Sequence, residues 1–444
     1  MRVERGSRPL VALVDGNNFY VSCERAFRPS LAGLPVCVLS NNDGCAIARS
    51  NEAKALGIKM GAPWFQIKHL AESDGLVALS ANFALYGDLS DRMMSLAAGL
   101  GPGQEVYSID ESFIDLAGVR GNLTERSFKI RARILQWVGI PCGIGIGATK
   151  TLAKLANHVA KTAERKPGSY RADLAQVCNF AELSPAEMNE VLSTTEVGEV
   201  WGVGRRIGKQ LTDSGIKSVA DLVRLDPVMV RSRWSVVLER TVRELQGTPC
   251  IDMEHAPVAK KEIACTRSFG QTITEFRQLV EAVTEFASLA AQKLRKQGST
   301  CRVVMVFVRS SPFRKDDEQY SRSITIPLRR PSSDTAHIVG AALAGLHGIY
   351  RPGINFAKAG VMLFELQSEQ IDQGELDLEP GDDSPENRGR LMHTLDDING
   401  RFGRGTVLMA SAGLAGHSRA WSMKQERRTP GYTTCWDDLV VVKA

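Results

Sequence analysis

The sequence contains no apolar run long enough to span a bilayer, since a stretch such as VVMVFV (303–308) has only the length of a strand. The start, MRVERGSRPLVALVD, is charged and reaches an acidic residue soon after its apolar part. A secretory signal peptide has a different pattern. We therefore expect neither a membrane-spanning nor a secreted protein, and the sequence predicts a cytoplasmic location.

Closely spaced metal-binding side chains are also lacking. The nine cysteines include no CxxC pair, and the seven histidines are scattered. Structural zinc needs soft ligands at close spacing, so no zinc site is expected. We expect these cysteines to be reduced and mostly buried.

The composition is that of a globular protein with several domains. A chain of 444 residues with 43% hydrophobic and 24% charged residues is too long for one ordinary core. Residues 256–331 carry 14 Lys and Arg against 7 Asp and Glu, whereas 369–387 carry eight acidic residues and no basic one. This order favours a polyanion-binding domain followed by a linker, although an ordinary solvated surface is the alternative. Residues 401–444 are basic again and predict a short extra module or an ordered partner-binding tail.

The first 170 residues alternate strand-like and helical patterns, which indicates an α+β class. LVALVDGNNFYVSCE predicts a buried strand, a turn and the start of a helix. PVCVLS (35–40) and CAIARS (45–50) predict two strands, and EVYSIDESFIDLAG predicts a strand pair folded about Asp110 and Glu111. PCGIGIGATK predicts a glycine-interrupted strand that leads into a helix.

Two further regions have patterns of their own. Residues 172–247 contain short helical patterns and predict a small all-helical domain. Residues 256–367 predict the order β-α-β-β-α-β of a ferredoxin-like module. The first helix of this module has one apolar face, at positions 276, 279, 283, 286, 290 and 294.

Three carboxylates stand at the ends of predicted strands. Asp15 ends an apolar strand, and Asp110 and Glu111 lie at a strand turn nearly a hundred residues later. If these strands are neighbours, the three side chains meet at one end of a sheet. Magnesium prefers oxygen ligands, and two ions about 3.5–4 Å apart can activate a hydroxyl and stabilise a departing pyrophosphate. The alternative is that Asp15 caps a helix and the acidic pair is an ordinary polar turn.

Other side chains near these acids fit the same chemistry. Phe19 and Tyr20 follow Asp15 closely, and Lys154 and Lys161, seven residues apart on a predicted helix, share roughly one face. A lysine aimed at a triphosphate acts as a point charge on the transferred group. Solvated helix lysines are the alternative.

The stretch WGVGRRIGKQL predicts a site for a DNA backbone. Gly202 and Gly204 form a tight turn, and Arg205, Arg206 and Lys209 follow at a helix start. Backbone N–H groups at such a start bind phosphate without reading sequence, as in a helix-hairpin-helix. The glycine pair is weak by itself, and the three basic residues favour this interpretation.

Taken in order, these segments resemble a Y-family DNA polymerase, most closely the UmuC-type catalytic subunit of DNA polymerase V. The resemblance extends over essentially the whole chain. It rests on VDGNNFYVSCE, MGAPWF, VYSIDESFIDL, GIGIGATKTLAKLANHVAK, VWGVGRRIGKQL and the terminal TPGYTT. The early aspartate motif together with SIDE is typical of the family, and IARSNEAKALG with VLERTVREL points to the UmuC branch.

The resemblance implies two Mg²⁺ ions as cofactors and a deoxynucleoside triphosphate as substrate. Asp15, Asp110 and Glu111 would be the catalytic metal ligands, and the carbonyl of Gly16 would be a further one.

It also implies which residues contact the nucleotide. Tyr20, with Phe19 beside it, matches the steric-gate aromatic that clashes with a ribose 2′-hydroxyl, and Lys161 matches a lysine that contacts the triphosphate. Where many members have Tyr and Arg on the first fingers helix, this chain has Asn51 and Lys54. Lys54 can still meet a phosphate, but without the fork of arginine. Asn51 is left out of the expected site.

The implied fold is a right hand with an added domain. Gly44, Ala46 and Ala48 would form a low roof over the templating base, which permits lesion bypass and lowers accuracy. The expected domains are the palm (1–25 and 78–170), the fingers (26–77), the all-helical thumb (171–247), the little finger (256–367) and an acidic linker with a C-terminal partner-binding region (368–444).

The implied function is error-prone translesion synthesis on primer-template DNA in the SOS response, in the cytoplasm and in association with the nucleoid. A cleaved UmuD-like dimer, RecA and the sliding clamp are the expected partners. The clamp peptide is typically Gln-Leu-x-Leu-Phe, and the nearest match, around Leu376 and Leu378, lacks the glutamine and the aromatic residue. The clamp contact therefore stays open.

Two alternatives remain from the residues alone. A metal-dependent nuclease or phosphodiesterase also uses clustered carboxylates, but it gives no reason for Tyr20 or for a triphosphate lysine. A non-catalytic DNA-binding scaffold gives no reason for all three carboxylates.

Overall fold

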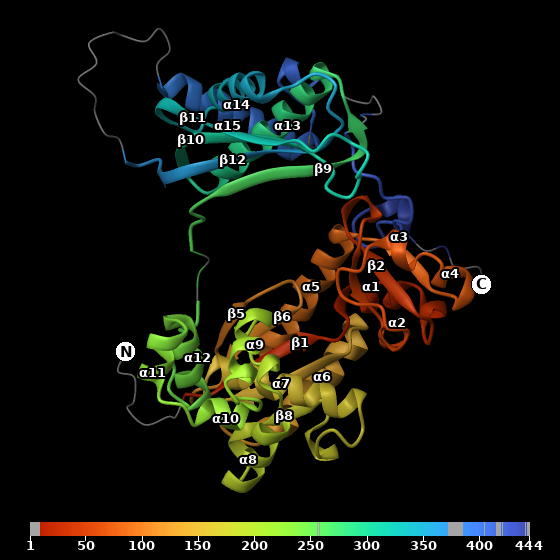
Figure 1. Ribbon diagram of the computed structural model, residues 1–444, viewed down its shortest axis with the longest axis vertical. Coiled ribbons are helices and arrows are strands. Elements are labelled where there is room, and N and C mark those ends of the chain that lie inside the picture. Colours follow the sequence, from red (N-terminus) through yellow and green to blue (C-terminus); the bar gives the residue numbers. More distant parts are fainter. Residues whose placement is uncertain are drawn as a thin grey trace. The chain divides into compact units, whose positions relative to one another are not determined.

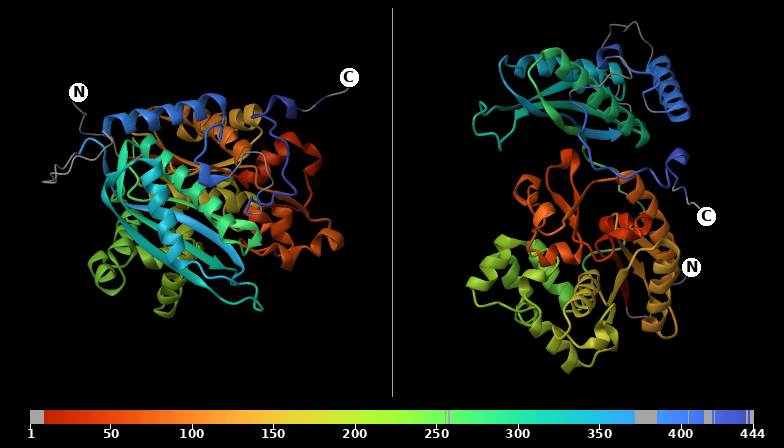
Figure 2. Two further views of the ribbon diagram at one scale, coloured as in Figure 1. Left: turned by 90° about the horizontal axis from the view of Figure 1, so that it is seen from above. Right: turned by 90° about the vertical axis from the view of Figure 1, so that its right-hand side faces the viewer.

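The computed structural model describes residues 9–254, 256, 258–371, 385–403, 405–413, 419, 421–439 and 441. It divides into two compact units (Figure 1, Figure 2). Unit 1 comprises Met1–Ser40, Gly44–Pro257 and Arg427–Ala444, and unit 2 comprises Asn41–Asp43 and Val258–Glu426. Within the described ranges, the helices are all too short or too polar to cross a membrane.

Unit 1 contains eight described strands and twelve described α-helices. The strands are β1 (Val11–Gly16), β2 (Val36–Leu39), β3 (Ala46–Arg49), β4 (Val77–Ser80), β5 (Gly103–Val106), β6 (Glu111–Asp115), β7 (Cys142–Gly147) and β8 (Val177–Asn179). The helices are α1 (Phe19–Phe27), α2 (Asn51–Ala55), α3 (Trp64–Ile67), α4 (Leu70–Ser73), α5 (Phe83–Ala97), α6 (Leu123–Val138), α7 (Lys150–Arg165), α8 (Pro185–Thr194), α9 (Arg205–Asp213), α10 (Val219–Val223), α11 (Pro227–Arg233) and α12 (Val236–Leu245).

The larger sheet of unit 1 has the order β5-β6-β1-β7-β8, with β1 at its centre. Successive side chains of a strand point to opposite faces of the sheet. Because Ala12, Leu13 and Val14 of β1 are all apolar, this strand is apolar on both faces. Ala12 and Val14 pack against a core formed with α1, α5 and α6, whereas Leu13 meets Phe113 and Ala153 of α7 on the other face. Helices therefore cover both faces of this sheet, and the strand ends at one edge carry the candidate site.

A second sheet, β3-β2-β4, supports α2, α3 and α4. β4 runs parallel to β2, with Val36 opposite Val77 and Leu39 opposite Ser80. The expected boundary between fingers and palm, after residue 77, thus falls inside a strand of this sheet. Pairing with β2 makes β4 a strand of this sheet. The hydrophobic pattern of residues 77–80 does not reveal with which strand they pair.

The helical region begins later than expected. Within 172–247, the three residues of β8 pair in parallel with β7 and extend the larger sheet of unit 1. They are fully buried, and three residues are too few to produce a recognisable periodicity. The helices α8 to α12 follow and share a separate apolar core with α7.

Unit 2 confirms the predicted order β-α-β-β-α-β. Its elements are β9 (Ile263–Ile273), α13 (Phe276–Lys296), β10 (Ser299–Ser310), β11 (Ser321–Ser332), α14 (Thr335–Ile349), β12 (Phe356–Ser368) and, beyond the undescribed 372–384, α15 (Pro385–Phe402). The sheet order is β11-β10-β12-β9, and neighbouring strands are antiparallel. α13 and α14 pack together on it, and the apolar positions 279, 283, 286, 290 and 294 of α13 are buried as predicted (Figure 1).

Candidate active site

The acidic residues at the end of β1 and at the start of β6 lie side by side. The two strands pair antiparallel, with Asp15 directly opposite Glu111. The backbone N–H of Gly16 donates to the carbonyl of Asp110 at 2.9 Å. A side chain at position 16 would approach the Phe19 ring to 2.8 Å, so only glycine fits here without a shift. The expectation that the two strands are neighbours is confirmed.

Ser108 holds the turn that carries Asp110 and Glu111. Its hydroxyl donates to Asp110 Oδ1 at 2.6 Å and accepts from the backbone N–H groups of Asp110 and Glu111 at 3.2 and 3.0 Å. This side chain orients the Asp110 carboxylate. We did not predict it, although a serine two residues before a functional aspartate is a signal for such a turn.

Two lysines of α7 neutralise two of the three carboxylates. Lys161 Nζ lies 2.6 Å from Asp15 Oδ1, and Lys154 Nζ lies 2.8 Å from Glu111 Oε2. Lys154 also lies over the rings of Tyr107 and Trp201. Across the described residues, His, Cys, Asp and Glu side chains form no group of three that could hold a metal ion as they stand. The oxygen donors suit a hard cation, and such a cation must compete with the lysines for Asp15 and Glu111.

Close packing of α7 on β7 brings these lysines to the carboxylates. A Cβ at Gly145 would come within 2.1 Å of the Asn157 backbone nitrogen, and one at Gly147 within 2.6 Å of the Leu152 Cβ. The glycines of GIGIG therefore let the helix lie directly on the strand. Asn157 fixes this arrangement by donating to the carbonyl of Gly143 at 3.0 Å.

The electrostatic environment of Asp15 favours a cation. Burial is the main reason that the pKa of Asp15 is raised to about 6; Lys161 opposes the rise, while Glu111 and Asp110 add to it. A largely buried carboxylate with two acidic neighbours is stabilised by added positive charge.

A cavity of about 710 Å³ adjoins this edge of the sheet. It is lined by Asp15, Gly16, Asn17, Asn18, Phe19, Tyr20, Ser22, Arg25, Ile47, Ala48, Arg49, Asn51, Lys54, Met60, Asp110, Pro141, Lys161, Glu164 and Arg165. Of the expected roof residues, Ala48 lines it, whereas Ala46 is buried in the core beneath α2 to α4. Asn51, which was left out of the expected site, also lines it and accepts a hydrogen bond from Asn18.

Basic side chains from two helices and a strand face this cavity. The pKa of Lys54 is lowered to about 8, chiefly by burial and further by Arg165, Arg49 and Lys161. Such mutual repulsion is relieved by a bound polyanion. We did not predict Arg49 and Arg165. Arg165 stands four residues after Lys161 on α7, and this helical spacing could have indicated it.

Tyr20 adds an aromatic ring to the lining of this cavity. Its ring stacks on Tyr86, with centroids 4.6 Å apart and planes 17° apart, and meets Phe83 edge-on at 5.9 Å. Asn18 begins α1 in a left-handed conformation (φ 47°), which turns the chain sharply after β1. Phe19 is almost fully buried in the core, so its main contacts are structural.

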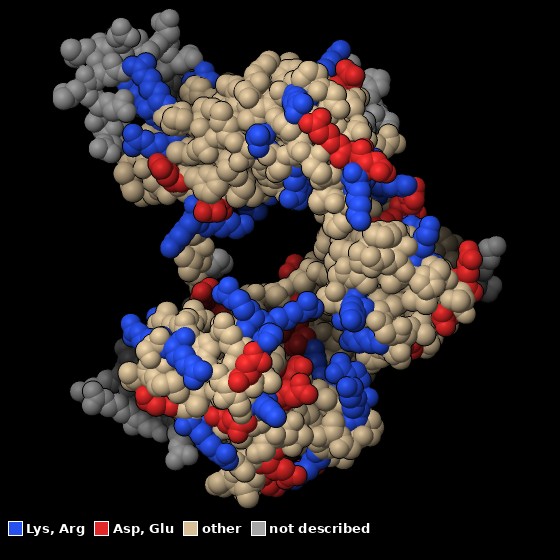
Figure 3. Space-filling view, viewed as in Figure 1, with Lys and Arg blue, Asp and Glu red and all other residues tan. Residues whose placement is uncertain are grey.

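The hairpin before α9 is separate from the cavity. Gly202 has a φ of 88°, and Gly204 precedes the first turn of α9. Arg205 and Arg206 are exposed, and Lys and Arg side chains gather beside α9 in Figure 3. Lys209 is also exposed and pairs with Asp213 at 2.8 Å. The residues that line the cavity do not include this hairpin.

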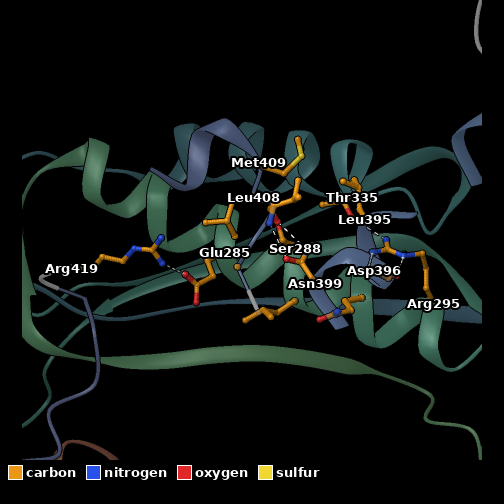
Figure 4. A pocket seen from close by; sticks show the side chains of 14 residues that line it. Glu285, Ser288, Arg295, Thr335, Leu395, Asp396, Asn399, Leu408, Met409 and Arg419 are labelled. Atoms are coloured by element: carbon orange, nitrogen blue, oxygen red, sulfur yellow. Dashed lines mark hydrogen bonds and ion pairs between the residues drawn. The ribbon is translucent and has the colours of Figure 1, made fainter. Parts of the chain in front are cut away.

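Unit 2 contains a different cavity, of about 510 Å³, between α13, α15 and residues 405–409 (Figure 4). Its charged groups pair with one another. Arg295 binds Asp396 through two nitrogens at 2.7 and 2.8 Å, and Arg419 pairs with Glu285. These contacts attach α15 and Arg419 to α13. The degenerate clamp motif around Leu376 and Leu378 lies outside the described residues.

Comparisons with known proteins agree with this geometry. Residues 14–158 match the impB/mucB/samB family, and residues 260–378 match the C-terminal domain of that family. Residues 389–442 match a domain of unknown function (DUF4113). A Y-family DNA polymerase chimera of Dbh and Dpo4 has a TM-score of 0.62 at 21% identity, covering 81% of this chain and 99% of that chain. This likeness supports the right-hand polymerase fold.

Relatives extend over the whole chain. It is 43% identical to Protein UmuC of Salmonella typhimurium, over 98% of this chain and 100% of the relative. It is 41% identical to Protein ImpB of the same species, with the same coverage, and 27% identical to DNA polymerase IV of Pelotomaculum thermopropionicum, over 90% of this chain and 94% of the relative. The chain therefore belongs to the impB/mucB/samB family and is a UmuC-type translesion DNA polymerase of the Y-family.

Proposed function

We propose that this chain adds deoxynucleotides to a primer 3′-end opposite damaged template. The reaction would take place where the end of β1 lies beside the start of β6. The observation that carries the proposal is one cavity that joins acidic, basic and aromatic walls. Asp15 and Asp110 supply its acidic groups, Lys54 and Lys161 supply basic groups, and Tyr20 supplies an aromatic ring.

Asp15, Asp110 and Glu111, with the Gly16 carbonyl, are the proposed ligands of two Mg²⁺ ions. Bound there, the ions would lower the pKa of the primer hydroxyl and neutralise the leaving pyrophosphate. Ser108 fixes the direction of the Asp110 carboxylate through its 2.6 Å hydrogen bond. The raised pKa of Asp15 supports a cation at this edge.

The basic wall is proposed to hold the triphosphate. Lys161 faces both Asp15 and the cavity, so its ammonium can exchange the carboxylate for a phosphate. Lys54, Arg49 and Arg165 add positive charge to the same cavity, and Arg165 and Arg49 contribute to the lowered pKa of Lys54. Preorganised charge of this kind stabilises a developing negative charge without reorganisation.

Tyr20 is the proposed steric gate against ribonucleotides. Its stacking on Tyr86 and its edge contact with Phe83 limit its movement, as a gate requires. Replacing Tyr20 with alanine should reduce the preference for deoxynucleotides by roughly 10²-fold, the equivalent of a clash of about 3 kcal/mol.

The remaining contacts are proposed from chemistry and from the family. The hairpin of Gly202 and Gly204 with Arg205, Arg206 and Lys209 would grip primer-template phosphates. A cleaved UmuD-like dimer, RecA and the sliding clamp are proposed partners. Incorporation opposite an abasic site, with and without a UmuD-like dimer and activated RecA, measures the dependence on the first two.

Primer extension with Mg²⁺ tests the proposal. A labelled primer should lengthen only when deoxynucleotides are added. Shortening of that strand without added nucleotide would instead indicate a nuclease. An Asp110→Ala variant that retained full bypass synthesis would contradict the assignment of the carboxylates and favour a scaffold.

A further inference from the structure

The C-terminal segment belongs to unit 1 and packs against α1, the end of β4 and the start of α5. Residues 427–439 are described there, next to the red and orange elements in Figure 1. The backbone N–H of Ser80, at the end of β4, donates to the carbonyl of Arg427 at 3.0 Å. Tyr432 is buried and stacks on Phe27 of α1, with centroids 4.8 Å and planes 6° apart. The segment is thus part of the folded unit.

Thr429 occupies the centre of this contact. It is 6% exposed, and its hydroxyl accepts from Asn82 Nδ2 at 3.2 Å and donates to Glu24 Oε1 at 3.2 Å. Asn82 Nδ2 also donates to the carbonyls of Thr429 and Pro430, at 3.2 and 3.0 Å. Asn82 is the N-cap of α5, so the start of α5 is tied directly to the C-terminal segment.

Glu24 links Thr429 to the proposed gate. It lies on α1, four residues after Tyr20, and is fully buried. Its Oε1 accepts from the Tyr86 hydroxyl at 2.6 Å, and the Tyr86 ring is the one that stacks on Tyr20. Contacts therefore run without a break from Thr429 through Glu24 and Tyr86 to Tyr20.

Few groups hold Glu24 in place. Its Oε2 has no hydrogen-bond partner within the described part of the chain, so Tyr86 and Thr429 supply its side-chain donors. Burial raises the pKa of Glu24, and the hydrogen bonds from Tyr86 and Thr429 oppose this rise. Removing one of two donors from a buried carboxyl costs more than an average hydrogen bond, so the side chain is expected to move instead.

We propose that Thr429 is a positioning residue for sugar discrimination, holding Tyr20 in place through Glu24 and Tyr86. This inference rests on the proposed gate function of Tyr20. The C-terminal region matches a domain of unknown function. The inference gives this region a part in shaping the proposed nucleotide cavity. A gate displaced by a fraction of an ångström excludes a 2′-hydroxyl less well, and misplacement by about 1 Å can cost roughly 10²-fold.

The test uses the full chain under conditions that support wild-type incorporation. The quantity measured is the ratio of kcat/KM for a deoxynucleotide to that for the matching ribonucleotide. Because both substrates are compared in one preparation, an inactive fraction cancels from the ratio. Thr429→Val removes the hydroxyl with little change of shape, Thr429→Ser restores it, and Thr433→Val is the matched control.

Thr433 suits this control because its hydroxyl is buried on the same segment and has no hydrogen-bond partner in the described structure. Thr429→Val should lower the ratio roughly tenfold, because a displacement of Tyr20 by less than 1 Å should cost less than the 10²-fold given above. Thr429→Ser and Thr433→Val should stay within about twofold of wild type, the spread expected without a lost buried partner. Adding Tyr86→Phe to Thr429→Val should lower the ratio little further, since both act on Glu24.

Tyr20→Ala separates the two levels of the proposal. If Tyr20→Ala loses discrimination while Thr429→Val keeps the wild-type ratio, the positioning role of Thr429 is wrong and the gate stands. If Tyr20→Ala itself keeps discrimination, the gate function fails and the role of Thr429 with it. Fully additive effects of Thr429→Val and Tyr86→Phe would exclude the route through Glu24.

Discussion

The acidic residues and the aromatic residues of the proposed nucleotide cavity are held by different kinds of interaction. At the acidic edge, charges pair with charges, as in the contacts of Lys161 with Asp15 and of Lys154 with Glu111. Around Tyr20, the Tyr86 ring stacks on the Tyr20 ring, and a buried hydrogen bond joins the Tyr86 hydroxyl to Glu24. Charge pairs can exchange partners for the proposed metal ions and triphosphate, whereas a stacked and buried network resists movement. The first side suits chemistry and the second suits selection.

The largest effect is expected from removing one of the proposed metal ligands. Asp110→Ala should lower primer extension by roughly 10³-fold or more, the equivalent of about 4 kcal/mol of lost transition-state stabilisation. Single-turnover incorporation measures it, and thermal unfolding checks the fold. Asp91→Ala, at an exposed position of α5, is the matched control and should retain wild-type activity. A tenfold loss or less in Asp110→Ala would mean that Asp110 is not a ligand the reaction needs.

A smaller effect is expected from removing the side chain that orients Asp110. Ser108→Ala removes the hydroxyl that directs Asp110. The Mg²⁺ concentration for half-maximal incorporation should rise roughly tenfold, as expected when a partner of a metal ligand is lost. Sugar discrimination should stay unchanged, because the contacts of Tyr20 are not altered. A changed sugar ratio with an unchanged Mg²⁺ requirement would contradict the separation of the two sides.

The basic wall should respond to pH. The pKa of Lys54 is lowered to about 8, so the free protein loses this positive charge as pH rises through that value. The KM for a deoxynucleotide should then rise roughly threefold between pH 7 and 9, since one charge–phosphate contact weakens. Lys54→Arg keeps its charge throughout this range. Its KM should be flat where that of wild type rises, and identical pH profiles would remove Lys54 from the triphosphate contact.

The smallest effect concerns the hairpin before α9, away from both sides of the cavity. Arg205→Gln should weaken primer-template binding similarly for all sequences and reduce the salt slope by about 1, because one phosphate contact is lost. Fluorescence anisotropy at several salt concentrations measures this. Asp226 is the N-cap of α11 in the same region, and Asp226→Asn serves as the control. An unchanged slope would show that Arg205 does not touch the backbone.

Contiguous motifs made much of the acidic edge predictable. Asp15 lies near the end of the buried strand β1, and Asp110 and Glu111 lie at the start of β6, so only the pairing of these two strands was needed to bring them together. The alternation of elements and the apolar face of α13 predicted the fold class for the same reason, because periodicity reports which face is buried. The pairing of β8 with β7 was missed since it involves only three residues.

The contacts behind Tyr20 could not be predicted in this way. Glu24 and Thr429 are 405 positions apart, and no local pattern connects them. TPGYTT was evident as a motif, but its neighbours depend on where the chain re-enters unit 1 after α15. The ion pairs of Lys154 and Lys161 were also missed, since a lysine near a triphosphate site and a lysine on a carboxylate have the same sequence signal.

Metal binding tests the assignment of Asp15, Asp110 and Glu111 most directly. Mn²⁺ can replace Mg²⁺ at oxygen ligands and can be counted by electron paramagnetic resonance. The wild-type chain, bound to primer-template DNA and a non-hydrolysable deoxynucleotide, should hold two Mn²⁺ ions, in line with a paired-ion site of about 3.5–4 Å. Asp110→Ala should hold fewer in the same complex. Equal numbers bound with equal affinity would contradict the placement of the catalytic ions on these carboxylates.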